Sequence, residues 1–239
     1  ADDGMRGNVE LHLTYDEEAG GEIGPKWILD NGHSRPDYVI CAGFTHGITV
    51  AHNGCLHVEV EVTGLSGHAA MPEKGVDALE AATAILGDLY TYRKTLDAAR
   101  SKVDGITSPT LVVGLICGGI NTNVVPDRVV FRIDRRVVPE ENFDAAERAL
   151  TAHIQQAAAG KPGITVTVKR ILQALPFVPL PGQERIVTAI QRHARSVMGI
   201  DEFASLRDWV GRGQTRRDVV TAAAITPCCR RPKRPGGTA

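Results

Sequence analysis

Three consecutive carboxylates, Asp16, Glu17 and Glu18, follow directly after a short segment in which every second residue is apolar. Adjacent negative charges repel one another unless solvent, cations or a bound metal compensates them. In open α/β sheets, ligands and catalytic groups collect where strands end. The triplet is therefore a candidate catalytic or metal-binding site. The alternative is an acidic loop that is simply solvated.

The elements around the triplet predict the start of a three-layer α/β unit. Residues 9–13 alternate as a strand does, and Gly20 and Gly21 open a segment with apolar residues at helical spacing. The pair Asn31 and Gly32 is suited to end that helix with a left-handed cap. Residues 37–42 and 48–51 are expected to be further strands.

A different pattern runs from about residue 55 to residue 169, where the expected elements follow the order βαββαβ. This is the order of a ferredoxin-like sandwich, an antiparallel sheet with two helices on one face. It indicates an inserted second domain. The expected strands are 55–62, 110–116, 124–137 and 164–168, and the expected helices are 76–100, with Leu79, Ala82, Leu86 and Leu89 on one stripe, and 142–159.

These patterns divide the chain into four parts. The fold class is α/β: a partial three-layer α/β catalytic domain with an inserted ferredoxin-like domain. The first part of the catalytic domain is expected at 1–53, the inserted domain at 54–172, a returning helix of the catalytic domain at 173–205, and a basic tail without a fold signal at 206–239.

Composition limits the classes of function. The 239 residues carry 27 basic and 28 acidic side chains, so the whole chain is not a polyanion binder, and we expect no nucleic-acid partner. The five cysteines form no C-x-x-C pair and are expected to be reduced. Because no long apolar run or secretory signal is present, we expect a cytoplasmic protein with no membrane partner.

Four stretches together resemble one family, the zinc-dependent amidohydrolases and exopeptidases that include aminoacylase, acetylornithine deacetylase, succinyl-diaminopimelate desuccinylase and glutamate carboxypeptidase. The resemblance covers roughly residues 7 to 200, and four motifs in register are far more specific than one. The stretches are Thr14 to Gly21, Gly64 to Ala78, Gly118 to Asp127, and Asp134 to Arg136.

The resemblance implies a site and its chemistry. A pair of zinc ions, with Co²⁺ and Mn²⁺ as other candidates, activates a water that attacks an amide. Glu17 matches the general base and Glu18 a metal ligand. His68 and Asn123 match donors to the tetrahedral oxyanion, with His68 reaching the partner subunit's site. Arg136 matches the arginine that clamps a substrate carboxylate, which implies an N-acyl amino acid or a small peptide.

Each assignment has an alternative, and some neighbours are given other roles. His68 could be a solvated loop histidine, and asparagine in a turn can simply bond its own backbone, which suits Asn121 better than Asn123. Asp16 is expected to support the turn, and Arg135 is expected to face solvent. By the same resemblance, the inserted domain serves as a lid and as the surface of a homodimer.

The chain departs from the family pattern at several metal ligands. Two ligands that precede the acidic turn in the family are absent, a third aligns with Gly43, and no histidine follows His193. His46 could replace the third ligand. We therefore expect a chain truncated at both ends, with a reading-frame change after about Leu206 as one hypothesis. The expected function is metal-dependent hydrolysis, impaired or lost in this chain. The alternatives are a non-catalytic dimerisation or binding module and a small-molecule sensor.

Overall fold

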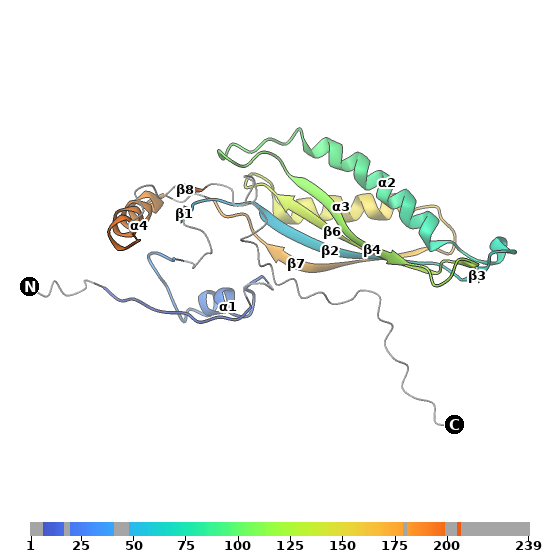
Figure 1. Ribbon diagram of the computed structural model, residues 1–239, viewed down its shortest axis with the longest axis horizontal. Helices are drawn as coiled ribbons and strands as arrows, with labels where there is room; N and C mark the ends of the chain where they lie inside the picture. Colours follow the sequence, from blue (N-terminus) through green and yellow to red (C-terminus); the bar gives the residue numbers. More distant parts are fainter. Residues whose placement is uncertain (1–6, 17–19, 41–47, 179–180, 199–204, 207–239) are drawn as a thin grey trace, which may run out of the picture.

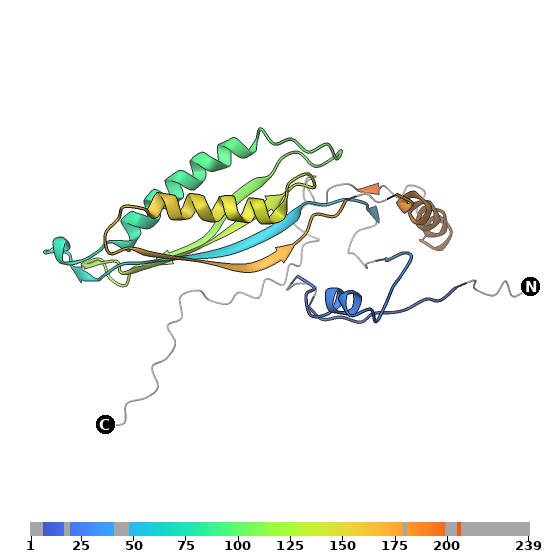
Figure 2. The ribbon, with the colours of Figure 1, turned by 180° about the vertical axis from the view of Figure 1, so that it is seen from behind.

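The computed structural model describes residues 7–16, 20–40, 48–178, 181–198 and 205–206. Its main body is a four-stranded antiparallel sheet with the strand order β4-β6-β2-β7. Two helices, α2 and α3, cover one face of this sheet and leave the other face open, as Figures 1 and 2 show from opposite sides. The elements are β2 (Gly54–Thr63), α2 (Ala78–Leu96), β4 (Thr110–Gly118), β6 (Arg128–Val137), α3 (Phe143–Ala158) and β7 (Thr165–Ala174). This order is the βαββαβ order expected from the sequence.

Alternation along the central strands separates the core from the open face. In β2, the apolar residues that the sequence places at every second position are buried against the helices. Strand β6 pairs with β2 along its whole length and buries Phe131 and Ile133 on the same side. The open face carries the polar residues of both strands, including ion pairs between Glu59 and Arg132 and between Glu61 and Arg128.

Helix α2 begins at a well-formed cap. The carboxylate of Asp77 accepts hydrogen bonds from the backbone nitrogens of Leu79 and Glu80 at 2.8 and 3.0 Å. The expected stripe is partly wrong, because Leu79 is 45% exposed. The rest of the stripe holds, because Ala82 and Leu89 are buried and Leu86 packs against the core at partial burial. The buried face of the helix consists of Ala78, Ala81, Ala82, Ile85, Leu89 and Leu96.

Short elements form a separate two-stranded sheet near one end of the main sheet. Strand β3 (Gly67–His68) pairs with β5 (Val124–Val125), and the single-turn helix η2 (Pro72–Lys74) lies between β3 and α2 along the chain. The expected strand over 124–137 is thus two strands. They are separated at Pro126 and Asp127, where proline has no backbone N–H to donate to a ladder.

The inserted domain joins the rest of the chain through two adjacent segments, which we call the neck. His52 and Phe177 exchange backbone hydrogen bonds of 3.1 and 3.0 Å, and their rings lie 5.6 Å apart. Beyond the neck, β1 (Ile48–Thr49) pairs in parallel with β8 (Ser205–Leu206), and α4 (Gln183–Met198) follows β7. The returning helix expected within residues 173–205 is therefore present.

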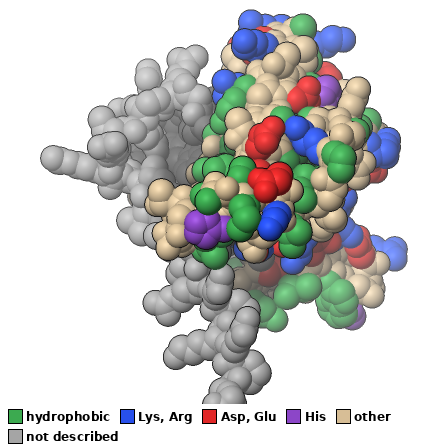
Figure 3. Space-filling model, turned by 90° about the vertical axis from the view of Figure 1, so that its right-hand side faces the viewer, with side chains coloured by type: hydrophobic (Ala, Val, Ile, Leu, Met, Phe, Trp, Pro, Cys, Tyr) green, Lys and Arg blue, Asp and Glu red, His purple; other side chains and the backbone are tan. Residues whose placement is uncertain are grey.

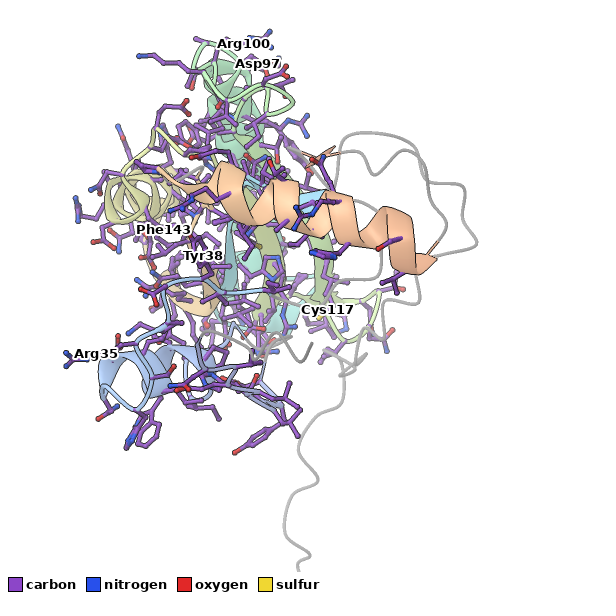
Figure 4. All side chains as sticks on the ribbon, turned by 90° about the vertical axis from the view of Figure 1, so that its left-hand side faces the viewer. Arg35, Tyr38, Asp97, Arg100, Cys117 and Phe143 are labelled. Atoms are coloured by element: carbon purple, nitrogen blue, oxygen red, sulfur yellow. The ribbon has the colours of Figure 1, made fainter. Side chains whose placement is uncertain are left out.

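The N-terminal segment differs from expectation. Residues 9–13 form no strand, and Val9, Leu11 and Leu13 are all exposed; residues 37–40 also lie outside any strand. A strand needs a partner to satisfy its backbone groups, and the described residues place none beside these segments. The intervening helix is the short α1 (Pro25–Asp30), and Figure 4 labels Arg35 beside it. Its expected end is confirmed, because Gly32 has a φ of 69°.

Candidate functional site

The pairing of β3 with β5 brings His68 beside Asn123. His68 lies opposite Val124 in the ladder, and the backbone nitrogen of Ala69 donates to the carbonyl of Asn123 at 3.0 Å. Two stretches more than fifty positions apart in the sequence are thereby joined into one surface. We call this the His68 end of the domain, and Figure 3 looks onto it.

The contacts of His68 define which ring nitrogen can donate outward. Its Nδ1 accepts a hydrogen bond of 3.1 Å from the backbone nitrogen of Ala70. A neutral imidazole whose Nδ1 accepts must carry its proton on Nε2. The exposed side chain therefore presents an N–H donor at the surface, which is the capability that an oxyanion contact needs.

The two asparagines of the neighbouring turn differ in their contacts. The side-chain oxygen of Asn121 accepts from the backbone nitrogen of Thr122 at 2.7 Å, so this side chain serves its own turn. The carbonyl of Asn121 also accepts from Val124. The amide of Asn123 is exposed and does not take part in that turn bond. Asn123 is thus the asparagine whose side chain is available for a ligand.

Glycines hold the His68 loop close to the start of α2. A β-carbon on Gly64 would overlap the carbonyl oxygen of Val76, and one on Gly67 would lie 3.0 Å from the nitrogen of Gly75. Leu65 and Val76 exchange backbone hydrogen bonds of 3.0 and 2.7 Å across this contact. These glycines therefore permit a close approach of two backbone segments of the same chain.

Arg136 lies near the other end of β6, in a charged cluster on the open face. Its guanidinium donates to Oδ2 of Asp134 at 2.9 Å, and Nε2 of His57 lies 3.3 Å from the same oxygen. Cys55 is the next residue along this face of β2, opposite Arg136 in register. We call these four residues the Arg136 end. Of the arginine side chain, 34% remains exposed and available to a ligand.

The groups of this cluster change one another's protonation. The hydrogen bond to Asp134, followed by that to Cys55, raises the pKa of His57 to about 9. Burial acts to raise the pKa of Asp134, but the contacts with His57 and Arg136 outweigh it and the pKa is lowered. At neutral pH Asp134 is thus a carboxylate that holds two cationic partners.

Arg135 corrects the expectation that it faces solvent. Alternation along β6 directs it to the helical face with Phe131 and Ile133, where it is completely buried. Its guanidinium donates to Oε1 of Glu141 at 2.6 Å and also to the carbonyl of Arg136. Because adjacent strand residues face opposite sides, only Arg136 of this pair can reach a ligand on the open face.

The His68 end and the Arg136 end are far apart within one chain. They flank opposite ends of β6, and at about 3.3 Å per residue Arg128 and Arg136 are separated by roughly 25 Å. The structure therefore joins His68 with Asn123 but does not bring either residue to Arg136. Any small ligand that contacts both ends must be held by more than one copy of the domain.

Part of the acidic turn is described. The carboxylate of Asp16 accepts hydrogen bonds from the backbone nitrogens of Ile23 and Gly24 at 2.8 and 2.9 Å, so Asp16 supports the turn as expected. Glu17 and Glu18 lie outside the described residues. His46 and Gly43 lie outside them as well.

Sequence reasoning missed the grouping of Cys55, His57 and Asp134. One ligand-type atom of each lies within 4.8 Å of those of the other two. The signal was present, because Cys55 and His57 occupy alternate positions of one strand and therefore share a face. The pairing of that face with Asp134 depends on the register of β6, which the sequence alone did not fix.

The described fold matches a known class of domain. Residues 50–162 match the peptidase dimerisation domain of the M20 family. This confirms the family resemblance, and the inserted domain is a dimerisation domain of the M20 peptidases and amidohydrolases. Enzymes of this family are metal-dependent, generally with zinc. No helix among the described residues is long and apolar enough to cross a membrane.

One curated relative and two solved structures illustrate what the chain is similar to. Acetylornithine deacetylase from Vibrio parahaemolyticus is 31% identical over 186 residues, which cover 76% of this chain and 47% of that protein. Aminopeptidase PepT from Bacillus cereus has a similar fold, with a TM-score of 0.53 at 23% identity over 84% of this chain and 50% of that one. Human carnosine dipeptidase 1 gives a TM-score of 0.50 at 19% identity, covering 68% of this chain and 45% of its own. The chain spans about half the length of the curated relatives it matches.

Proposed function

We propose that this chain supplies the lid, the dimer surface and the substrate contacts of a metal-dependent hydrolase that cleaves the amide bond of N-acyl amino acids or small peptides. The observation that carries the proposal is the placement of two sets of polar groups on one M20 dimerisation domain. His68 and Asn123 are joined at one end, and Arg136 is oriented by Asp134 at the other.

The separation of the two ends makes the proposed site a composite of two copies. Arg136 of one protomer clamps the substrate carboxylate with its planar fork. The Nε2–H of His68 and the amide of Asn123 from the second copy donate to the oxyanion that forms when the amide is attacked. Neither copy alone presents both contacts, because β6 holds them roughly 25 Å apart.

The acidic turn completes the proposed site. When bound, zinc, or alternatively Co²⁺ or Mn²⁺, supplies a water of lowered pKa. Glu17 takes the proton of the attacking nucleophile and passes it to the leaving nitrogen, while Glu18 and His46 hold metal. Two side chains are fewer than the three or four protein ligands that one zinc site takes. A dinuclear site therefore requires further ligands.

Strand β4 is the proposed dimer surface. It is an edge of the sheet and contains no charged residue, whereas the opposite edge, β7, carries Lys169 and Arg170. Val112, Leu115 and Ile116 are each about half exposed on β4. An uncharged edge with apolar side chains favours pairing with another strand, while charged edges oppose it.

Hydrolysis and metal content test the proposal together. The purified chain is assayed with N-acetyl amino acids, and with the matching amides that lack the carboxylate, after dialysis against Zn²⁺, Co²⁺ or Mn²⁺. We expect Glu17→Ala to abolish any turnover and Arg136→Ala to raise KM at least about tenfold for the acids only. Absence of both metal at the acidic turn and hydrolysis would instead support the non-catalytic dimerisation module.

Mixing two inactive variants tests the composite site. At acid-substrate concentrations well below the wild-type KM, His68→Ala and Arg136→Ala proteins are each expected to lose most activity. After subunit exchange, half of the dimers are mixed and each mixed dimer has one intact site, so about a quarter of the activity should return. A mixture that stays inactive while exchange is demonstrated would contradict a site built from two copies.

A further inference from the structure

Three side chains of different donor type converge on the open face of the sheet. The thiol of Cys55, the imidazole of His57 and the carboxylate of Asp134 come from the two central strands, whose register is fixed by a continuous ladder. His57 and Asp134 lie directly opposite each other. A rigid two-strand framework therefore holds sulfur, nitrogen and oxygen donors at one place.

The distances suit a small cation. One ligand-type atom of each residue lies within 4.8 Å of the others, and Nε2 of His57 is 3.3 Å from Oδ2 of Asp134. Zinc bonds of about 2.0 to 2.3 Å in tetrahedral geometry place ligand atoms roughly 3.3 to 3.8 Å apart. Two donors already have that separation, and a shift of about 1 Å brings in the third.

Asp134 has an unmet bonding requirement. Oδ2 accepts from Arg136 and contacts His57, but Oδ1 is buried and has no hydrogen-bond partner among the described residues. Leaving a buried carboxylate oxygen unpaired is unfavourable. A cation bound to the carboxylate through both oxygens would supply the missing partner of Oδ1, while Arg136 keeps Oδ2 oriented as outer-sphere partners of metal ligands do.

We propose that Cys55, His57 and Asp134 form a binding site for Zn²⁺ on the open face of the sheet, with its fourth position open to water. Thiolate and imidazole donors select zinc over magnesium or calcium, and three protein ligands with an open position are a common zinc arrangement. Binding releases the thiol proton of Cys55 and the imidazole proton that faces Asp134 to solvent. Both His57 and Asp134 are about one-third exposed, which gives the ion a route to the buried sulfur.

Cobalt is the probe that separates this site from one built of oxygen and nitrogen donors. Co²⁺ bound to a thiolate gives an intense charge-transfer absorption in the near ultraviolet, which carboxylates and imidazoles do not produce. We expect about one equivalent of Co²⁺ to give this absorption in the reduced full chain, and Zn²⁺ to displace it. Glu17→Ala and Glu18→Ala should retain it.

Variants assign the signal to the three residues. Cys55→Ser should lose the absorption, and His57→Gln and Asp134→Asn should weaken Co²⁺ binding at least about tenfold. The matched control replaces the other four cysteines, Cys41, Cys117, Cys228 and Cys229, with serine and should keep the absorption. Absorption that survives Cys55→Ser, or that is absent when Cys55 is the sole cysteine, would overturn the proposal.

Alkylation gives a readout that does not depend on folding of the Cys55 variant. In the wild-type chain, Zn²⁺ should slow the reaction of Cys55 with iodoacetamide, as followed by mass spectrometry of the peptide that contains it. Circular dichroism checks that His57→Gln is folded, and this variant should lose the protection. Equal protection of Cys55 in His57→Gln would show that zinc acts elsewhere.

Discussion

Adjacent arginines in β6 show how one step along a strand separates a buried side chain from a partly exposed one. Arg135 is buried and paired with Glu141, whereas Arg136 faces the open side and bonds Asp134. The charge of Arg135 is tolerated because Glu141 lies against it at 2.6 Å. The two residues therefore lie in different surroundings, although they are chemically identical neighbours.

Removing the partner of Arg135 should be strongly destabilising. Glu141→Ala leaves a buried guanidinium without its carboxylate, and a loss of about 3 to 5 kcal/mol is expected in the free energy of unfolding. Urea denaturation measures it. Glu61→Ala breaks the exposed pair with Arg128 and serves as the control, with an expected loss below about 1 kcal/mol. Equal losses in both variants would show that burial of Arg135 has no energetic consequence.

At the scale of single residues, the sequence predicted side-chain contacts only between residues that are close together in the chain. Asp16 supports its own turn, and Asn121 bonds its own backbone, as their residue types indicated. The predicted orientation of Arg135 was wrong, because it depends on which face of β6 the helices cover. The cluster around His57 depends on strand register, which no local pattern specifies.

At the scale of elements, the close contact between the His68 loop and the start of α2 is sensitive to one methyl group. Gly64→Ala would push the new β-carbon into the carbonyl of Val76 and disrupt its hydrogen bonds with Leu65. We expect a loss of about 1 to 3 kcal/mol in the free energy of unfolding. Hydrogen exchange should also become faster in residues 65–76.

The matched glycine lies in α2 itself. A β-carbon on Gly87 meets nothing within 4 Å, so Gly87→Ala should stabilise the helix by about 1 kcal/mol through higher helix propensity. In one thermal denaturation series, we expect Gly64→Ala to lower the melting temperature and Gly87→Ala to raise it. A stability gain from Gly64→Ala would show that the loop does not need the close approach.

The order of elements was predictable because hydrophobic alternation and helical caps are local signals. Strands β2 and β4 and helices α2 and α3 lie where the patterns placed them. Residues 9–13 have the same alternation but form no strand, because pairing requires a neighbour and their apolar side chains are exposed. A periodic pattern thus predicts which face a strand would bury, and the presence of a partner decides whether the strand forms.

At the scale of the whole molecule, the uncharged edge β4 should control self-association. Leu115→Lys places a charge on that edge and is expected to weaken dimer formation at least about tenfold, as measured by analytical ultracentrifugation. Ile171→Lys makes the same change on β7, at a residue of similar exposure, and should leave association unchanged. A stronger effect of Ile171→Lys would assign the dimer surface to β7.

The neck at His52 and Phe177 has a consequence for how separable this domain is from the rest of the chain. Its incoming and outgoing segments are hydrogen-bonded side by side, so the domain connects to the rest of the chain as a single loop would. Domains whose ends meet in this way tolerate transfer into and out of other chains. Replacing the domain with a short loop between residues 52 and 177 would therefore leave the two ends of the remaining backbone already side by side.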